Sequence, residues 1–226
     1  VAGQAVLAAF ALSIPSAAFG AVMAPQILEW MGASSSVVAG SSYLSVLFGG
    51  SSTIFLIFLN NAIFRGAGDA VIAMRALWLA NGINIFLDPI LIFGWGPFPA
   101  LGLVGASIAT TIARALGVGY QFMVLFQGRH RVTIKARHLW LNPPAMRTLM
   151  RISISGIVQF FVATASWMGV MRIMALFGSV TLAGYTIALR LVLFPILVSW
   201  GLSNAASTLV GQSLGAKKLA RAERAV

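Results

Sequence analysis

Three polar side chains share one face of an otherwise apolar stretch, "ANGINIFLDPILIFG". Asn81, Asn84 and Asp88 are spaced i, i+3 and i+7, which brings them to one side of a helix. Pro89 has no N–H, so the carbonyl of Ile85 loses its helical donor beside them. A carboxylate, an amide oxygen and a free carbonyl are hard ligands that suit a cation such as Na⁺. The carboxylate could instead bind and release a proton.

The next apolar segment, residues 102–126, supplies hydroxyl groups at a matching depth. It runs back antiparallel to the previous segment, and a rise of about 1.5 Å per residue places residues 107–110 near the level of Asp88. Glycine and alanine residues on this segment permit close helix approach. We therefore expect a hydroxyl from Ser107, Thr110 or its neighbour Thr111 to complete an oxygen cluster with the polar face.

A purely structural role for Asp88 is the alternative. An ion pair with Arg114, about one turn deeper, would also account for an acid at membrane depth. Acids within membrane spans cost about 2.5–3.5 kcal/mol on insertion scales and are functional by default. Asn84 alone would more often join helices than bind an ion. Its spacing to Asp88 favours the ligand role, and the pair with Arg114 stays open.

Two more polar stripes lie in residues 149–177 and 180–212. The first carries Ser155, Gln159 and Ser166, and the second carries Ser199, Ser203, Asn204, Ser207 and Thr208. Such stripes either line a wet cavity or pack between helices. Our candidates for cavity lining are Asn81, Ser107, Gln159 and Asn204.

The elements that carry these residues need lipid as their solvent. The chain of 226 residues is 59% hydrophobic and 8% charged, whereas a soluble domain carries about 25% charged residues. A helical span needs about 20 apolar residues. Six segments qualify, at about residues 5–27, 40–64, 70–95, 102–126, 149–177 and 180–212. The sequence therefore predicts an all-α integral membrane protein with six transmembrane helices.

The longest connection, residues 127–148, ends in a helix-start signal. In "LNPP", Asn142 suits the N-cap and Pro143 the first helical position. Trp140 suits the membrane interface.

The basic residues predict the orientation in the membrane. Twelve of the 15 Lys and Arg residues fall on one side of the membrane. They lie in the connections after the second and fourth segments, at the helix ends that flank these connections, and in the C-terminal tail. By the positive-inside rule this side is cytoplasmic. The net charge of +11 therefore needs no nucleic-acid partner, since no soluble basic surface remains to bind one.

The sequence disfavours an enzyme. An aspartyl pair would need a second acid at membrane depth, and His130 and His138 lie in the predicted cytoplasmic connection. The HExxH pattern is absent, and "RGAGD" is a turn between two apolar helices rather than a phosphate loop. The chain has no cysteine for a thiolate metal site. We expect no catalytic residue and no cofactor beyond a coupling ion.

Several blocks, in this order, resemble the multidrug and toxic-compound extrusion (MATE) family. "FRGAGDA", "NINIFLDPILIFG" and "LGLVGASIAT" are similar to its first half, and "AGYTIALRL" with "STLVGQSLGAKKLARAERAV" to the start of its second half. The resemblance covers essentially the whole chain and implies a twelve-helix fold of two lobes. It implies helices three to six of the N-lobe at 1–126, a cytoplasmic linker at 127–148, and helices seven and eight of the C-lobe at 149–226. Because the chain lacks an initial Met and ends in a polar run, we expect an internal fragment.

The same resemblance implies a cation site in the N-lobe. The family's fifth helix supplies an Asn and an Asp four residues apart, which fall on Asn84 and Asp88, and its sixth helix supplies a Thr, which falls on Thr110. These three would hold Na⁺ if the coupling ion is sodium. The NorM-like branch carries a Glu in helix seven where this sequence has Val162. That departure favours the DinF-like arrangement.

The resemblance implies a secondary active antiporter of the bacterial inner membrane. It would act as a monomer and export drugs or other amphipathic organic cations in exchange for Na⁺ or H⁺. A lipid-linked saccharide flippase of related architecture is the alternative, but it would need several deep cationic side chains, and only Arg114 and Arg190 lie deep. A membrane scaffold that transports nothing is the third hypothesis. It predicts that removing Asp88 leaves transport unchanged.

Overall fold

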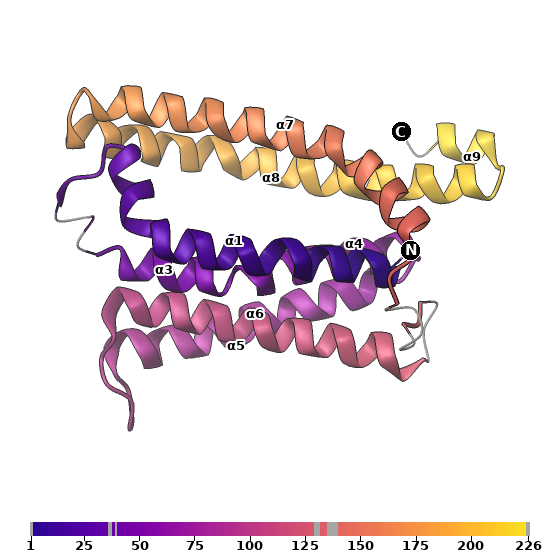
Figure 1. Ribbon diagram of the computed structural model, residues 1–226, viewed down its shortest axis with the longest axis horizontal. Helices are drawn as coiled ribbons and strands as arrows, with labels where there is room; N and C mark the ends of the chain where they lie inside the picture. Colours follow the sequence, from indigo (N-terminus) through magenta and orange to yellow (C-terminus); the bar gives the residue numbers. More distant parts are fainter. Residues whose placement is uncertain (1, 36–37, 39, 129–131, 135–139, 225–226) are drawn as a thin grey trace. The chain divides into compact units, whose positions relative to one another are not determined.

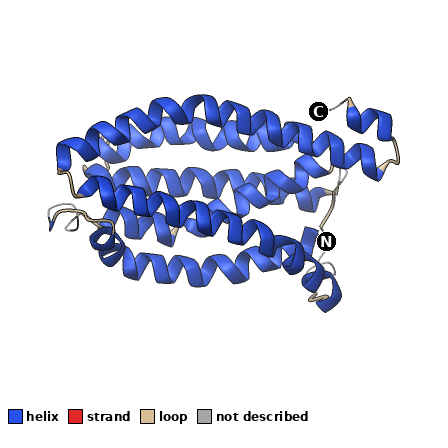
Figure 2. Ribbon diagram, turned by 90° about the horizontal axis from the view of Figure 1, so that it is seen from above, coloured by secondary structure: helices blue, strands red, loops and turns tan. Residues whose placement is uncertain are grey.

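The computed structural model describes residues 2–35, 38, 40–128, 132–134 and 140–224. The elements within them are helices, without strands (Figures 1 and 2). In chain order they are α1 (Ala2–Trp30), α3 (Ser42–Gly49), α4 (Ser51–Gly66), α5 (Ala70–Phe93), α6 (Gly102–Gln127), α7 (Pro143–Ala175), α8 (Ser179–Gly215) and α9 (Leu219–Glu223). The predicted all-α class is confirmed.

The predicted spans match the helices closely. Five helices are long and apolar enough to cross a membrane, and a sixth span results if α3 and α4 are counted together. The fifth span begins earlier than predicted, because α7 starts at Pro143. The backbone N–H of Ala145 donates to Oδ1 of Asn142 at 3.2 Å, which confirms Asn142 as the cap.

The second predicted span is not one straight helix. Residues 40–64 were expected to be continuous, whereas α3 and α4 meet at Gly50 with a bend of 44°. A side chain added at Gly50 would collide with the side chain of Thr111 on α6. Glycine therefore lets the bend approach α6 closely, at a place where glycine pairs commonly kink helices.

The chain divides into two compact units, Val1–Thr164 and Ala165–Val226. The boundary between them falls inside α7, which is a continuous helix. The expected lobe boundary at the linker, residues 127–148, therefore stays a prediction.

The first unit is a bundle of α1, α3, α4, α5 and α6. Two apolar clusters fill it, one around Phe64 and Leu125 and the other around Ile57 and Val118. The antiparallel helices α5 and α6 form its most extensive contact, and they run side by side in Figure 1. At Gly105, a side chain would collide with the backbone of Leu91. Small residues therefore hold these two helices at backbone contact.

Part of the connection after α6 packs against the same bundle. The backbone N–H of Ile134 donates to the carbonyl of Leu125 at 3.1 Å, and the Ile134 side chain is buried. The side chain of Gln4 on α1 donates to the carbonyl of Trp140 at 2.7 Å and accepts from the N–H of Asn142 at 3.0 Å. These bonds join the start of α7 to α1.

The helices that follow bury almost none of their side chains within the chain. None of the described residues of α7 is buried, and Ser213 is the one buried residue of α8. The chain reverses between them at Gly178, whose φ of 92° suits glycine. Helices of this kind are stable in lipid because their backbone hydrogen bonds are internal.

Candidate functional site: a polar cluster between α5 and α6

Asn84, Asp88 and Thr110 meet in the first unit. The amide nitrogen Nδ2 of Asn84 lies 2.9 Å from Oδ1 of Asp88 and 3.4 Å from Oγ1 of Thr110. All three side chains are partly buried. The structure thus brings together the three residues that the sequence singled out for ion binding, although their role as ion ligands stays a prediction.

Two features of the backbone position this cluster. Asn84 and Asp88 lie one turn apart on α5, so their side chains fall on the same face. Thr110 comes from α6, whose register against α5 is set by the N–H of Leu101, which donates to the carbonyl of Leu91 at 3.0 Å. The contact between Gly105 and the Leu91 backbone lies between that bond and the cluster. A shift of either helix would separate Thr110 from Asn84.

The amide group of Asn84 occupies the centre of the cluster. Its NH₂ faces two oxygens, the carboxylate of Asp88 and the hydroxyl of Thr110. In this arrangement Asn84 is a donor, whereas the sequence led us to expect its oxygen as a ligand. The physical reason is that a carboxylate accepts hydrogen bonds, so the group beside it donates. A half-turn of the amide would present Oδ1 instead and leave three side-chain oxygens facing the same point.

The expected alternative for Asp88 was an ion pair with Arg114. Within the part of the chain that the structure describes, the partner of Asp88 is Asn84, and no ion pair joins it to Arg114. Arg114 itself is partly buried on α6. The geometry therefore favours the polar cluster over the salt bridge.

The four candidates for cavity lining lie apart from this cluster or bond to their own helices. Asn81 is exposed on α5, and Gln159 is exposed on α7. Ser107 is fully buried and donates to the carbonyl of Val104 at 2.7 Å. Asn204 is exposed on α8 and donates to the carbonyl of Trp200 at 2.8 Å. Their assignment to a cavity stays a prediction.

The sequence reasoning missed a second polar group in the bundle. Asn60 and Asn61 on α4 and Gln121 on α6 are fully buried, and Nε2 of Gln121 donates to Oδ1 of Asn61 at 2.7 Å. The available signal was the presence of neutral amides inside the apolar runs "FLIFLNNAIF" and "GYQFMVLF". Neutral amides of this kind join helices within membranes.

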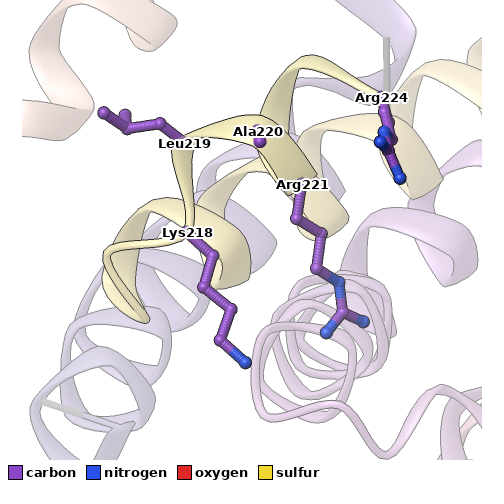
Figure 3. Close-up of a pocket in the computed structure, with 5 residues that line it drawn as sticks. All are labelled: Lys218, Leu219, Ala220, Arg221 and Arg224. Atoms are coloured by element: carbon purple, nitrogen blue, oxygen red, sulfur yellow. The ribbon is translucent and has the colours of Figure 1, made fainter.

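Two cavities of several hundred Å³ lie away from the polar cluster. One of about 500 Å³ is lined by Lys218, Leu219, Ala220, Arg221 and Arg224, at the turn between α8 and α9 (Figure 3). Its basic side chains lie in the tail predicted to be cytoplasmic. The other, of about 370 Å³, lies between α1 and α6 and has an apolar lining that includes Phe10, Phe122 and Phe126.

Known proteins match most of this chain. "Probable multidrug resistance protein NorM" of Thermotoga maritima is 30% identical over 180 residues, which are 78% of this chain and 38% of that protein. "Multidrug export protein MepA" of Staphylococcus haemolyticus is 30% identical over 179 residues, 79% of this chain and 38% of that protein. The chain thus spans less than half the length of these relatives.

The fold also matches solved structures. "Outward-facing conformation of a multidrug resistance MATE family transporter of the MOP superfamily" superposes with a TM-score of 0.82 at 22% identity, covering 99% of this chain and 50% of that one. This likeness supports the multi-pass membrane architecture. The MatE family matches residues 1–90 and 154–226, which are more than half of the chain. The chain therefore belongs to the MatE family, the multidrug and toxic-compound extrusion transporters.

Proposed function

We propose that the full-length protein is a secondary active antiporter that exports drugs or other amphipathic organic cations in exchange for Na⁺ or H⁺. The observation that carries this proposal is the Asn84–Asp88–Thr110 cluster, in which Asn84 donates to the acid on its own helix and to Thr110 on α6. The names of the relatives, a multidrug resistance protein and a multidrug export protein, support the substrate class. Its partners would be the small-molecule substrate and the bilayer, and it would act as a monomer.

Asp88 would be the ion switch of this antiporter. A Na⁺ ion arriving at the carboxylate would replace the NH₂ of Asn84, whose amide would turn to offer Oδ1. Thr110 would supply the third oxygen, and hard oxygen ligands of this kind suit sodium. A proton on Asp88 would act similarly, because the neutral carboxyl accepts less strongly from Asn84. Either ion would change the bond between Asn84 and Asp88 within α5, and with it the contact of Asn84 with Thr110 on α6, and so would shift the balance between outward-facing and inward-facing states.

The site belongs to the N-lobe in this proposal. Val162, which stands where the NorM-like branch would carry an acid, is exposed on α7. Valine offers no ligand, so the coupling ion would be handled by the cluster around Asp88, as in the DinF-like arrangement.

Efflux of a small cationic dye from cells that express the full-length protein tests the proposal. Asp88→Asn keeps the size of the side chain but removes the charge, and we expect at least about a tenfold loss of gradient-driven efflux. Glu29→Gln is the matched control, because it makes the same change at the end of α1, outside the cluster. It should keep efflux at equal expression.

If Asp88→Asn retains gradient-coupled efflux at the unmodified level, the proposed role of the carboxylate is wrong. Failure of the unmodified protein to move any cationic dye would instead favour the flippase reading. Repeating the efflux assay with and without Na⁺ at one fixed pH would separate sodium from proton coupling.

A further inference from the structure

Three basic side chains border the cavity at the turn between α8 and α9. The cavity has a volume of about 500 Å³, and Lys218, Arg221 and Arg224 line it together with Leu219 and Ala220. Figure 3 shows the side chains of Lys218 and Arg221 extending to the same side of the ribbon. The lining of this cavity thus carries three positive charges and no carboxylate.

The backbone at the end of α8 brings these side chains together. The N–H of Lys217 donates to the carbonyl of Leu214 at 2.9 Å, and the N–H of Lys218 donates to the carbonyl of Ser213 at 2.9 Å. These two bonds close the last turn of α8 and reverse the chain. Helix α9 then contacts α8 and lies back over its end (Figure 1). Because the three basic residues follow one another at intervals of three positions, they lie along one side of α9.

The three charges have no acidic partner in the described part of the chain. No ion pair there involves Lys218, Arg221 or Arg224, and all three residues are exposed. Glu223, the acid of α9, does not line the cavity. A cavity lined by charges of one sign concentrates ions of the opposite sign, so this cavity favours an anion.

The position of the cavity after α8 places it at the edge of the bilayer. Helix α8 has 37 residues, which correspond to about 55 Å, whereas the hydrocarbon core is about 30 Å thick. One end of α8 must therefore emerge from the core, and the basic end is the costlier one to keep inside. This end is predicted to be cytoplasmic, where anionic phospholipids give the membrane surface a negative potential.

An apolar side chain in the lining favours a lipid over a free anion. Leu219 lines the same cavity and has an exposed fraction of 68%. A free phosphate gains nothing from an exposed leucine, whereas the glycerol and acyl part of a phospholipid covers it. Arginine binds phosphate oxygens through two parallel N–H groups, and lysine binds them as a point charge. We propose that Lys218, Arg221 and Arg224 bind the phosphate of an anionic phospholipid headgroup, at a site that does not depend on the proposed transport function.

Native mass spectrometry of the full-length protein in a neutral detergent, titrated with phosphatidylglycerol, tests this proposal. Lys218→Gln removes a charge from the cavity and should weaken binding of the lipid about fivefold. Lys217→Gln is the matched control, because Lys217 is the neighbouring exposed lysine and does not line the cavity. It should weaken binding by less than about twofold, since no charged membrane surface is present in detergent. Equal losses in the two variants would overturn the proposal.

Two further ligands identify what the cavity binds. Phosphatidylcholine with the same acyl chains carries no net negative charge, so its binding should be equal in the unmodified protein and in Lys218→Gln. A loss for phosphatidylcholine as large as that for phosphatidylglycerol would contradict selection of an anionic headgroup. Inorganic phosphate at the concentration of the lipid should leave the bound phosphatidylglycerol in place. If it displaces the lipid, the cavity binds a free anion and the proposal is wrong.

Substitutions at Arg221 separate the loss of charge from damage to the fold. Arg221→Gln should weaken binding of phosphatidylglycerol about fivefold, whereas Arg221→Lys keeps the charge and should stay within about threefold of the unmodified protein. Because Arg221 is exposed, the melting temperature of both variants without lipid should stay within about 1 °C of the unmodified protein. A loss in Arg221→Lys as large as that in Arg221→Gln would contradict binding through charge.

Discussion

The bundle of α1–α6 and the helices α7 and α8 use the same apolar composition in different ways. Within the bundle, side chains are buried in two apolar clusters. In α7 no described residue is buried, and in α8 only Ser213 is. All the same, both helices are long and apolar enough to cross a membrane. A sufficiently long apolar helix can span the membrane by itself. A packed interior between helices also needs small residues and polar groups that find partners on neighbouring helices.

The polar side chains show the same difference. In the bundle some of them bond to other segments, as Asn84 does to Thr110, Gln121 to Asn61 and Gln4 to Trp140, while others, such as Ser107, bond to their own helix. In α7 and α8 the corresponding bonds return to the same helix, as those of Ser155, Thr186 and Asn204 do. A side chain that satisfies itself locally tolerates lipid, but it adds nothing to the contact between helices. Paired substitutions in the two regions should separate these roles.

The largest difference in stability between paired variants of the two regions is expected at two helical glycines. Gly105→Ala would push a methyl group against the backbone at Leu91. Backbone atoms cannot move aside as a flexible side chain can. The free energy of unfolding should fall by about 2–3 kcal/mol. At Gly169 in α7 an added methyl group meets nothing within 4 Å, so Gly169→Ala should be neutral or stabilising by about 0.5–1 kcal/mol. Denaturant unfolding of both variants in detergent measures this, and equal losses would contradict the account.

A smaller difference is expected at two glutamines. Gln4→Leu removes the bonds to Trp140 and Asn142 and so takes away the partner of two backbone groups. It should cost about 1–3 kcal/mol of stability. Gln159 is exposed on α7, and Gln159→Leu should change stability by less than about 0.5 kcal/mol. The thermal midpoints of the two variants of this chain in detergent give the comparison, and an unchanged midpoint in Gln4→Leu would show that other contacts hold the segment.

The smallest difference is expected at two asparagines. Asn84→Leu breaks its bonds to Asp88 and Thr110, for which we expect a loss of about 0.6–1.7 kcal/mol, the range for polar contacts between membrane helices. Asn204→Leu removes only a bond within α8, and it should be close to neutral. Unfolding in detergent again measures both. A loss at Asn204 as large as at Asn84 would mean that α8 relies on interhelical bonding after all.

Much of the fold could be predicted because membrane helices are specified locally. Apolar runs of sufficient length predicted each span, and Asn142 with Pro143 predicted where α7 begins. The meeting of Asn84, Asp88 and Thr110 followed from helical spacing and from the antiparallel depth of two neighbouring segments. These inferences need only a few residues of sequence and one short turn.

The features that were missed depend on contacts distant in sequence. The bend at Gly50 packs against the side chain of Thr111 on α6, and the bonds of Gln4 reach a segment more than 130 residues away. Asn61 and Gln121 are 60 residues apart. Each partner alone is an ordinary glycine or amide, so no local pattern indicates the pair.

The most direct test of the central claim is ion movement driven by substrate. The full-length protein in proteoliposomes, given a gradient of a cationic dye, should move Na⁺ or H⁺ in the opposite direction. In Asp88→Asn this coupled ion movement should fall by at least about tenfold, while the Glu29→Gln control should keep it. Ion movement that persists undiminished in Asp88→Asn would contradict the claim that the Asn84–Asp88–Thr110 cluster binds the coupling ion.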